Sequence, residues 1–154
     1  MKIERYQPKY KQAFIDLNKE WLSEMFVIEP EDVSMFDNLD ELIDQGAEIF
    51  FAIDDSGVAL SCCMLAPLPN GEWEIAKFAT SRNARGKGIG RLCFDACLNC
   101  AEKMGLEKLL IVSNTKCEAG IHLYRKNGFT EIPVDRNLFP FERANIAFEK
   151  ILRK

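Results

Sequence analysis

The chain has 154 residues, of which 47% are hydrophobic and 29% are charged, and its net charge is −4. This is the length and composition of one globular domain, so we expect a single domain over residues 1–154 that buries roughly 70% of its unfolded surface. The acidic balance argues against a nucleic-acid-binding protein. The apolar run 58–69 is shorter than the roughly 18 residues of a membrane helix, and the mixed charges of residues 1–6 are unlike a secretory signal. We therefore expect a cytoplasmic protein with no nucleic-acid or membrane partner.

Hydrophobic periodicity predicts a mixed α/β domain. Residues at helical spacing alternate along the chain with short β-branched or alternating segments. Glu29-Pro30 interrupts the first helical pattern, and Asn70-Gly71 is a strong hairpin signal. Hairpins in the first half and a helical crossover in the second predict a mixed sheet. The expected strands are 2–6, 48–53, 58–65, 72–80, 109–112, 129–134 and 144–152, and the expected helices are 8–25, 38–44, 89–104 and 118–126.

A basic, glycine-rich loop at Arg85–Gly90 is the most informative segment. Its glycines allow positive φ and leave backbone N–H groups unobstructed. A helix is expected to begin at its end, and a helix N-terminus attracts anions. No acidic residue occurs between Glu74 and Asp95. The loop therefore predicts a phosphate site, although a solvated basic loop would have the same composition. The basic residues in this interval are Lys77, Arg82, Arg85, Lys87 and Arg91.

Two common phosphate-binding motifs do not fit this loop. A P-loop requires a Gly-Lys-Ser/Thr string, which the sequence lacks. A dinucleotide fingerprint has the spacing G-x-G-x-x-G, whereas the glycines here alternate as G-x-G-x-G. Arg85, Gly88 and Gly90 instead match the Arg/Gln-x-x-Gly-x-Gly/Ala signature. The loop thus resembles the cofactor loop of the GCN5-related N-acetyltransferase (GNAT) family.

Other segments extend the resemblance over essentially the whole chain, least clearly over residues 25–46. Leu123–Phe129 resembles the family's L-Y-x-K-x-G-F segment, and Glu74–Thr80 resembles the strand before the cofactor loop. Phe141–Glu149 is similar to the closing strand of small bacterial members, and Asn114 stands where the family often has asparagine. The resemblance implies the GNAT (acyl-CoA N-acyltransferase) fold, an α/β fold with a mixed, mostly antiparallel central sheet and a splayed parallel strand pair.

The resemblance also implies acetyl-CoA as co-substrate, held between strands 72–80 and 109–112. Loop amides would cradle its pyrophosphate, and backbone groups of the earlier strand would pair with the pantetheine arm. Arg82, Lys87 and Arg91 would add positive charge near the phosphates. The residues expected at the cofactor are Phe78, Ala79, Thr80, Arg85, Gly86, Lys87, Gly88, Ile89, Gly90, Arg91, Asn114 and Tyr124.

Two residues are candidates for catalysis in a direct acetyl transfer to a primary amine. Glu74 lies where several family members have a general base, which is needed because an alkylammonium with a pKa near ~10.4 must lose a proton before attack. Glu72 would face the same side of a regular strand and is an alternative base, and Glu74 could equally be a surface carboxylate. Tyr124 lies where the family commonly has a tyrosine that protonates the departing CoA thiolate. A packing role alone is the alternative for Tyr124.

The six cysteines are expected to be structural. Cys93, Cys97 and Cys100 fall on the apolar stripe of the helix 89–104, where cysteine packs as a small hydrophobic residue. A zinc site needs a second ligand pair, which Cys117 and His122 do not supply. We therefore expect no metal. A covalent route through Cys117 lacks a histidine at a recognisable spacing.

The sequence leaves the acceptor open. No lysine or arginine occurs between Glu20 and Ala76, yet fourteen carboxylates do. A cationic acceptor such as a polyamine, an aminoglycoside or a lysine side chain would fit an acidic pocket, but a solvated acidic face would look the same. The aromatic and methionine residues that could line such a pocket, or belong to the core, are Trp21, Met25, Phe26 and Phe36.

The sequence is also compatible with two other functions and with two oligomeric states. A domain of the same fold could bind acyl-CoA without turnover, as a sensor or partner module. A nucleic-acid-binding module could use the basic loop, although no second basic segment supports it. The protein could be a monomer, or a homodimer that pairs through its last strand.

Overall fold

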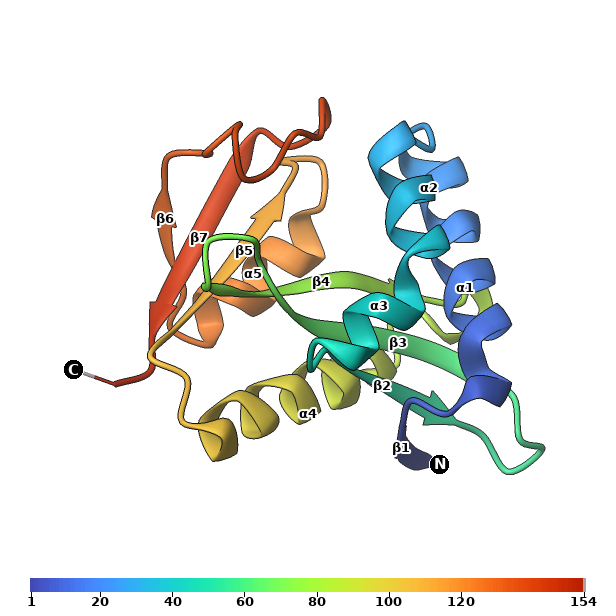
Figure 1. Cartoon of the computed structure of the whole chain (residues 1–154). Helices are drawn as coiled ribbons and strands as arrows, with labels where there is room; N and C mark the ends of the chain where they lie inside the picture. Colours follow the sequence, from blue (N-terminus) through green and yellow to red (C-terminus); the bar gives the residue numbers. More distant parts are fainter. Residues whose placement is uncertain (154) are drawn as a thin grey trace.

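The computed structural model describes residues 1–153, which are built around a seven-stranded sheet (Figure 1). Neighbouring strands are antiparallel, except β4 and β5, which are parallel. The strand order is β1-β2-β3-β4-β5-β7-β6. The strands are β1 (Lys2–Arg5), β2 (Glu48–Ile53), β3 (Ala59–Pro67), β4 (Trp73–Thr80), β5 (Lys108–Ser113), β6 (Thr130–Ile132) and β7 (Ile146–Ile151).

Helices cover both faces of the sheet (Figure 1). One core lies between the sheet and α4 and α5, and contains Phe50, Phe94 and Tyr124. The other lies between the sheet and α1, α2 and α3, and contains Phe14 and Phe51. Phe50 and Phe51 point to opposite cores because successive strand side chains alternate, so β2 is apolar on both faces. The helices are α1 (Lys11–Met25), α2 (Pro30–Asp37), α3 (Leu39–Asp44), α4 (Ile89–Met104) and α5 (Glu118–Lys126), with 3-10 turns at Pro8–Tyr10 and Arg82–Ala84.

The sheet opens between β4 and β5. These two strands pair only at Glu74 and Leu110 and then diverge (Figure 1). The register between β3 and β4 shifts near Cys62, and Lys77 of β4 adopts a positive φ of 51° at this irregularity. A bulge of this kind bends the strand and increases its twist. The separation of β4 from β5 leaves room in the middle of the sheet.

The predicted fold class is confirmed, and the seven expected strands all occur within about two residues of their predicted bounds. No helix was predicted for residues 30–37, which form α2. Pro30 ends the first helical pattern but also begins α2, because proline is well tolerated at the first position of a helix. Glu29 and Asp32 form a capping box that bonds the first N–H groups of α2.

The cysteines expected in the core are buried there. Cys93, Cys97 and Cys100 of α4 pack against the sheet, together with Cys63 of β3. Within residues 1–153, no three side chains of the usual ligand types are grouped so as to hold a metal ion. None of the helices formed by these residues has the length and apolar character required to cross a membrane.

Candidate active site

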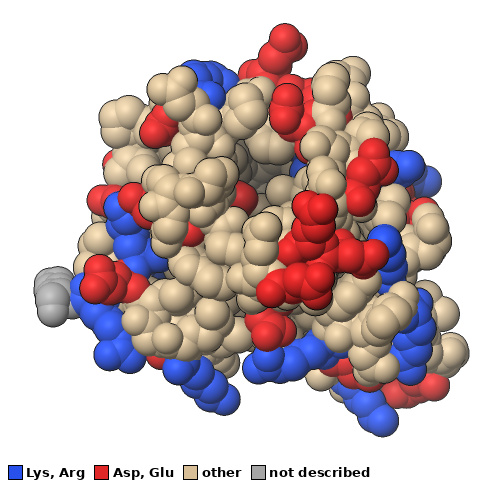
Figure 2. Space-filling view, in the orientation of Figure 1, with Lys and Arg blue, Asp and Glu red and all other residues tan. Residues whose placement is uncertain are grey.

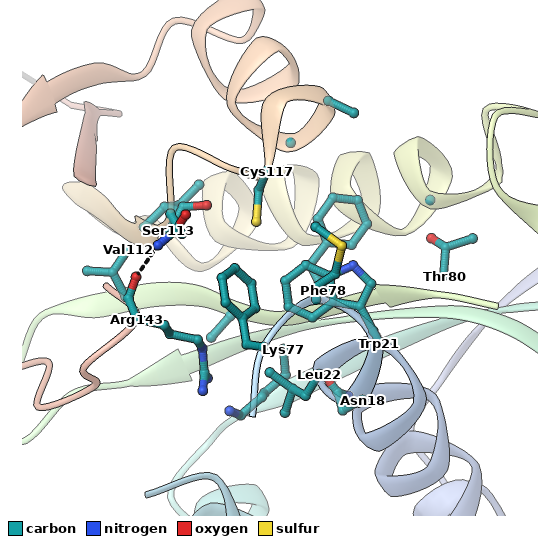
Figure 3. Close-up of a pocket in the computed structure, with 18 of the residues that line it drawn as sticks. Asn18, Trp21, Leu22, Lys77, Phe78, Thr80, Val112, Ser113, Cys117 and Arg143 are labelled. Carbon is teal, nitrogen blue, oxygen red and sulfur yellow. Dashed lines mark hydrogen bonds between the residues drawn. The ribbon is translucent and has the colours of Figure 1, made fainter. Parts of the chain in front are cut away.

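A cavity of about 530 Å³ lies where β4 and β5 diverge (Figure 3). Asn18 and Trp21 of α1 line it on one face of the sheet, and Gly120 and Tyr124 of α5 line it on the other. The cavity therefore passes through the sheet. A ligand in it would contact side chains from both helical layers.

The glycine loop closes one end of the cavity. Gly88 is the N-cap of α4 with φ of 77°, a conformation that favours glycine. Gly90 has a different requirement, because an added Cβ would lie 2.7 Å from Thr80 Oγ1 and 3.1 Å from the Phe78 ring. Thr80 is in turn held by Ser61, whose hydroxyl is 3.0 Å from the Thr80 hydroxyl. These contacts bring the start of α4 directly against the end of β4.

The arginines of the loop are bound by α1. Glu24 accepts hydrogen bonds from the side chains of Arg82 and Arg85, and the bond from Arg85 Nη1 is 2.7 Å long. These bonds lower the pKa of Glu24. Arg85 Nε donates to the carbonyl oxygen of Thr80 at 3.1 Å, while Arg85 Nη2 is buried without a hydrogen-bond partner among residues 1–153. Through its other two nitrogens, Arg85 joins the loop to the end of β4 and to α1.

Glu74 is buried in the wall at the point where β4 and β5 separate, with 7% of its surface exposed. Burial disfavours the charged carboxylate and raises the pKa of Glu74 to about 7, although nearby Lys77 acts in the opposite direction. Glu72 lies before β4 and does not line this cavity, and Lys108 Nζ donates to it at 3.3 Å. The structure therefore separates the two candidate bases.

Tyr124 lies on α5, on the opposite face of the sheet from Glu74. Its ring packs against Phe94 and Phe148, with centroid distances of 5.6 and 5.8 Å. Burial raises the pKa of the Tyr124 phenol, so this group stays protonated at neutral pH. A protonated hydroxyl at the cavity wall can donate a proton.

Cys117 precedes α5 and also lines the cavity (Figure 3). Burial raises the pKa of its thiol, with smaller opposing effects from Ser113 and other neighbours. A raised pKa reduces the fraction of thiolate, the nucleophilic form of cysteine. The environment of Cys117 therefore does not activate it as a nucleophile.

A buried ion cluster consists of Glu29, Asp32, Lys77 and Arg143, of which Lys77 and Arg143 line the cavity. Asp32 is fully buried and accepts hydrogen bonds from Lys77 Nζ at 2.5 Å and from Arg143 Nη2 at 2.6 Å. Burial alone would raise the pKa of Asp32, but these bonds lower it to about 2. Glu29 accepts from Arg143 Nη1 at 3.1 Å. The cluster joins α2 to β4 and to the connection between β6 and β7.

The structure brings eight of the predicted site residues to this cavity. Five others lie outside its lining, of which Ala79 is buried in the core under α1. Asn114 binds protein groups, because its Nδ2 donates to the carbonyl oxygen of Arg143 at 2.7 Å and its Oδ1 accepts from the backbone N–H of Lys116. Those that line the cavity are Glu74, Phe78, Thr80, Arg85, Gly86, Gly90, Asn114 and Tyr124, and those that do not are Ala79, Lys87, Gly88, Ile89 and Arg91.

Sequence reasoning missed Lys77, Arg143 and Lys116 as cavity residues. Lys77 could have been noticed as a charge inside an otherwise apolar strand, but nothing in the local pattern singles out Arg143. Lys116 reaches across the cleft, where its Nζ donates to the carbonyl oxygen of Met25 at 2.6 Å and lies 4.9 Å from the Phe26 ring centroid. The sequence left open whether four apolar residues of this region line the pocket or belong to the core. The cavity is lined by Trp21, Met25 and Phe26, whereas Phe36 is in the core.

The acidic segment of the sequence does not form an acidic pocket. Of its carboxylates, only Glu74 lines the cavity. Glu20 and Glu24 bind the Arg82–Arg85 segment, and Glu29 and Asp32 bind Lys77 and Arg143. Others gather on the outer surface over α2 and α3 (Figure 2). Most carboxylates of this segment therefore form ion pairs or face the solvent, and they are not available to bind a cationic acceptor in the cavity.

Comparison with known proteins identifies the family to which the chain belongs. Residues 13–129 match the family model described as the Acetyltransferase (GNAT) family. Amino-acid acetyltransferases of Yersinia pseudotuberculosis and Yersinia pestis are 27% identical over 107 residues, which are 69% of this chain and 23% of theirs. The chain thus spans about a quarter of the length of the curated relatives it matches.

Solved structures are similar over nearly the whole chain. A GNAT-family acetyltransferase from Staphylococcus aureus Mu50 has a TM-score of 0.86 at 19% identity, covering 99% of both chains. The yncA protein of Salmonella typhimurium, solved with its cofactor acetyl-CoA, has a TM-score of 0.78 at 15% identity, covering 100% of this chain and 95% of that one. At these identities the likeness establishes the fold. Together with the match over residues 13–129, it shows that this chain belongs to the GNAT acetyltransferase family.

Proposed function

We propose that the protein is an N-acetyltransferase that moves the acetyl group of acetyl-CoA to a primary amine in a single GNAT domain. The observation that carries this proposal is the cavity itself. It crosses the sheet between β4 and β5, and it is lined by a carboxylate with a pKa of about 7 and, from the other face, by a protonated phenol. A general base and a general acid on opposite sides of one cavity suit acyl transfer by direct attack.

The glycine loop suits the pyrophosphate of acetyl-CoA. It presents backbone N–H groups at the N-terminus of α4, where the helix dipole favours negative charge. Arg85 also lines this end of the cavity and adds positive charge there. The yncA protein was solved with acetyl-CoA, and its similar fold supports the same donor here. The pantetheine arm would then run along β4 toward Glu74.

Glu74 and Tyr124 divide the proton transfers. An ionised Glu74 accepts a proton from the acceptor ammonium, directly or through a water molecule, and the free amine attacks the acetyl carbonyl carbon. When the carbon–sulfur bond breaks, Tyr124 donates its proton to the CoA thiolate. The nitrogen of the tetrahedral adduct loses its second proton to the Tyr124 phenolate, which restores the phenol, and Glu74 releases the first proton to solvent. The products are the amide, CoA thiol and one proton.

Two measurements test the proposal. Acetyl-CoA at about 100 times its Kd should stabilise the protein by roughly 2.7 kcal/mol, or a rise of several degrees in melting temperature. A panel of primary amines should show release of free CoA that depends on an amine. The proposal would be wrong if acetyl-CoA neither stabilises the protein nor loses its acetyl group with any amine.

A non-catalytic acyl-CoA-binding domain is the second candidate. It predicts the same thermal shift but no amine-dependent CoA release. The buried Glu74 argues for the enzyme, because an ionisable carboxyl is costly to bury, and within residues 1–153 no group donates a hydrogen bond to it.

A further inference from the structure

The charges at the acceptor end of the cavity indicate the chemical class of the acceptor. Four cations line the cavity and only two carboxylates do. Arg85 belongs to the glycine loop, and the other charged residues of the lining are Lys77, Lys116, Arg143, Glu74 and Glu118. An acceptor of several positive charges would meet too few carboxylates here.

One edge of the Arg143 guanidinium group binds carboxylates, and another edge has no partner among the described residues. Its two terminal nitrogens, Nη1 and Nη2, donate to the two carboxylate oxygens of Asp32 at 2.7 and 2.6 Å, and Nη1 also donates to Glu29. A guanidinium has five N–H donors in a planar fork, so Nε–H and the second hydrogen of Nη2 form a further edge. Neither bonds to a described residue. Arg143 Nε is also not among the buried unpartnered atoms, so solvent reaches it.

The orientation of this edge is fixed before any ligand binds. The Arg143 guanidinium carbon lies 4.6 Å from the Phe141 ring centroid, and the side chain is 17% exposed at the cavity wall. Asp32 is itself held by Lys77. A planar donor pair that is already oriented loses little side-chain entropy on binding, and it matches the two oxygens of a carboxylate.

Lys77 lines the same cavity as Arg143 and Glu74. Its ammonium group donates to Asp32, the carboxylate that also binds Arg143. The cavity therefore offers a carboxyl group for the amine of an acceptor and an arginine edge for an anionic group of the same acceptor.

We propose that the acceptor is a small amine with a carboxylate close to it, such as an amino acid, and that the free edge of Arg143 binds this carboxylate. Arg143 is then the residue that determines acceptor specificity, and Lys77 and Asp32 hold it in position. This inference rests on the proposed acetyl transfer.

Matched acceptor pairs test the inference with the intact protein and acetyl-CoA. The twenty amino acids are compared with their amides and with the amines that lack the carboxyl group, and spermidine and kanamycin represent cationic acceptors. We expect at least one amino acid to exceed both of its matched analogues about ten-fold or more in kcat/KM, since a site built for hydrogen bonding rejects an analogue without the partner group. Equal rates within every pair, faster transfer to the cationic acceptors, or transfer to no carboxylate-bearing acceptor would overturn it.

Arg143→Lys tests the residue assigned to the carboxylate. Lysine keeps a positive charge beside Asp32 but has no second edge. We expect KM for the preferred amino acid to rise about ten-fold or more, while the thermal shift caused by acetyl-CoA is unchanged. Arg125→Lys, an exposed arginine on α5 outside the cavity, is the matched control and should leave KM unchanged.

The outcomes distinguish this inference from the proposed function. An unchanged KM in Arg143→Lys, with a normal thermal shift from acetyl-CoA, refutes the role of Arg143 and leaves acetyl transfer intact. If Arg143→Lys does not fold, the comparison of acceptor pairs with the native protein still decides the substrate class. Loss of both acetyl-CoA binding and transfer in the native protein would instead refute the proposed function.

Discussion

Glu74 and Tyr124 line the same cavity from opposite faces of the sheet. Glu74 pairs with Leu110 where β4 and β5 meet, while Tyr124 belongs to the core under α4 and α5, which also contains Ile111, the next residue of β5. Because neighbouring strand side chains alternate, Leu110 and Ile111 point to opposite faces. The carboxyl group that we propose as proton acceptor and the phenol that we propose as proton donor therefore line the cavity from opposite faces of the sheet.

Replacing Glu74 by glutamine should change both the rate and its dependence on pH. Since the pKa of Glu74 is about 7, native kcat/KM should rise with pH through about 7 as the carboxylate ionises. Glu74→Gln should lower kcat/KM at pH 8 by about 10² to 10⁴ and remove this inflection, leaving only the ionisation of the amine. Initial rates of both proteins, measured between about pH 5.5 and 9, give the two pH profiles. Glu72→Gln should keep the native profile, and a native profile in Glu74→Gln would exclude Glu74 as the base.

The same carboxyl should affect stability with a definite sign. The pKa of Glu74 is raised in the folded protein, so the folded state binds this proton more tightly than the unfolded state does. Its contribution to stability is present below the unfolded pKa of about 4.3 and is lost as pH rises to about 7. Glu74→Gln should therefore be stabilised relative to the native protein more at pH 7.5 than at about pH 4.5. Urea unfolding at the two pH values tests this, and a difference of opposite sign would contradict the buried environment of Glu74.

Tyr124→Phe should lower turnover without weakening acetyl-CoA binding. The phenylalanine ring preserves the packing against Phe94 and Phe148 and removes only the hydroxyl. We expect kcat to fall about 10²-fold, as for loss of a general acid, with an unchanged thermal shift from acetyl-CoA. Tyr6→Phe, outside the cavity, is the control. An unaltered kcat would leave Tyr124 with a packing role alone.

Gly90→Ala should disturb the donor site through a specific collision. The added Cβ would lie 2.7 Å from Thr80 Oγ1, so the start of α4 or the end of β4 must shift. Overpacking of this kind costs roughly 1–3 kcal/mol, and we expect a lower melting temperature and weaker acetyl-CoA binding. The double variant with Thr80→Ala, which removes the colliding oxygen, should recover part of both losses. No recovery would show that Gly90 is required for another reason.

Asp32→Asn should destabilise the protein more than an exposed substitution does. It removes the buried carboxylate between Lys77 and Arg143 and leaves two cations without their shared partner. Breaking a buried ion pair in this way costs about 3–5 kcal/mol. Because hydrogen bonds lower the pKa of Asp32 to about 2, its contribution is present above an unfolded pKa near ~3.9 and lost as pH falls toward 2. Denaturant unfolding at pH 7 should show this loss, and Asp37→Asn should be nearly neutral.

Much of the fold was predictable because it depends on local patterns. The strands and four of the five helices follow from periodicity, and Asn70-Gly71 correctly marked the turn between β3 and β4. The helix α2 does not follow from periodicity, because a proline that ends one helical pattern can also begin the next helix, as Pro30 does here with the cap from Glu29. The choice between Glu72 and Glu74 was not predictable, since two residues that share a face of a strand differ only in what covers them.

The sequence by itself determined the family and the glycine loop, because these depend on short motifs whose backbone and chemical requirements are local. The family resemblance implied Tyr124 and either Glu74 or Glu72 as catalytic candidates. Only the tertiary structure decided the environment of each group. The packing buries Glu74 and thereby raises its pKa. It pairs carboxylates of the acidic segment with arginines and a lysine, and it brings Arg143 beside Asp32, 111 residues away in the chain. Burial and long-range ion pairs depend on the packing of distant segments, and for this reason the donor was readable from the sequence while the acceptor site was not.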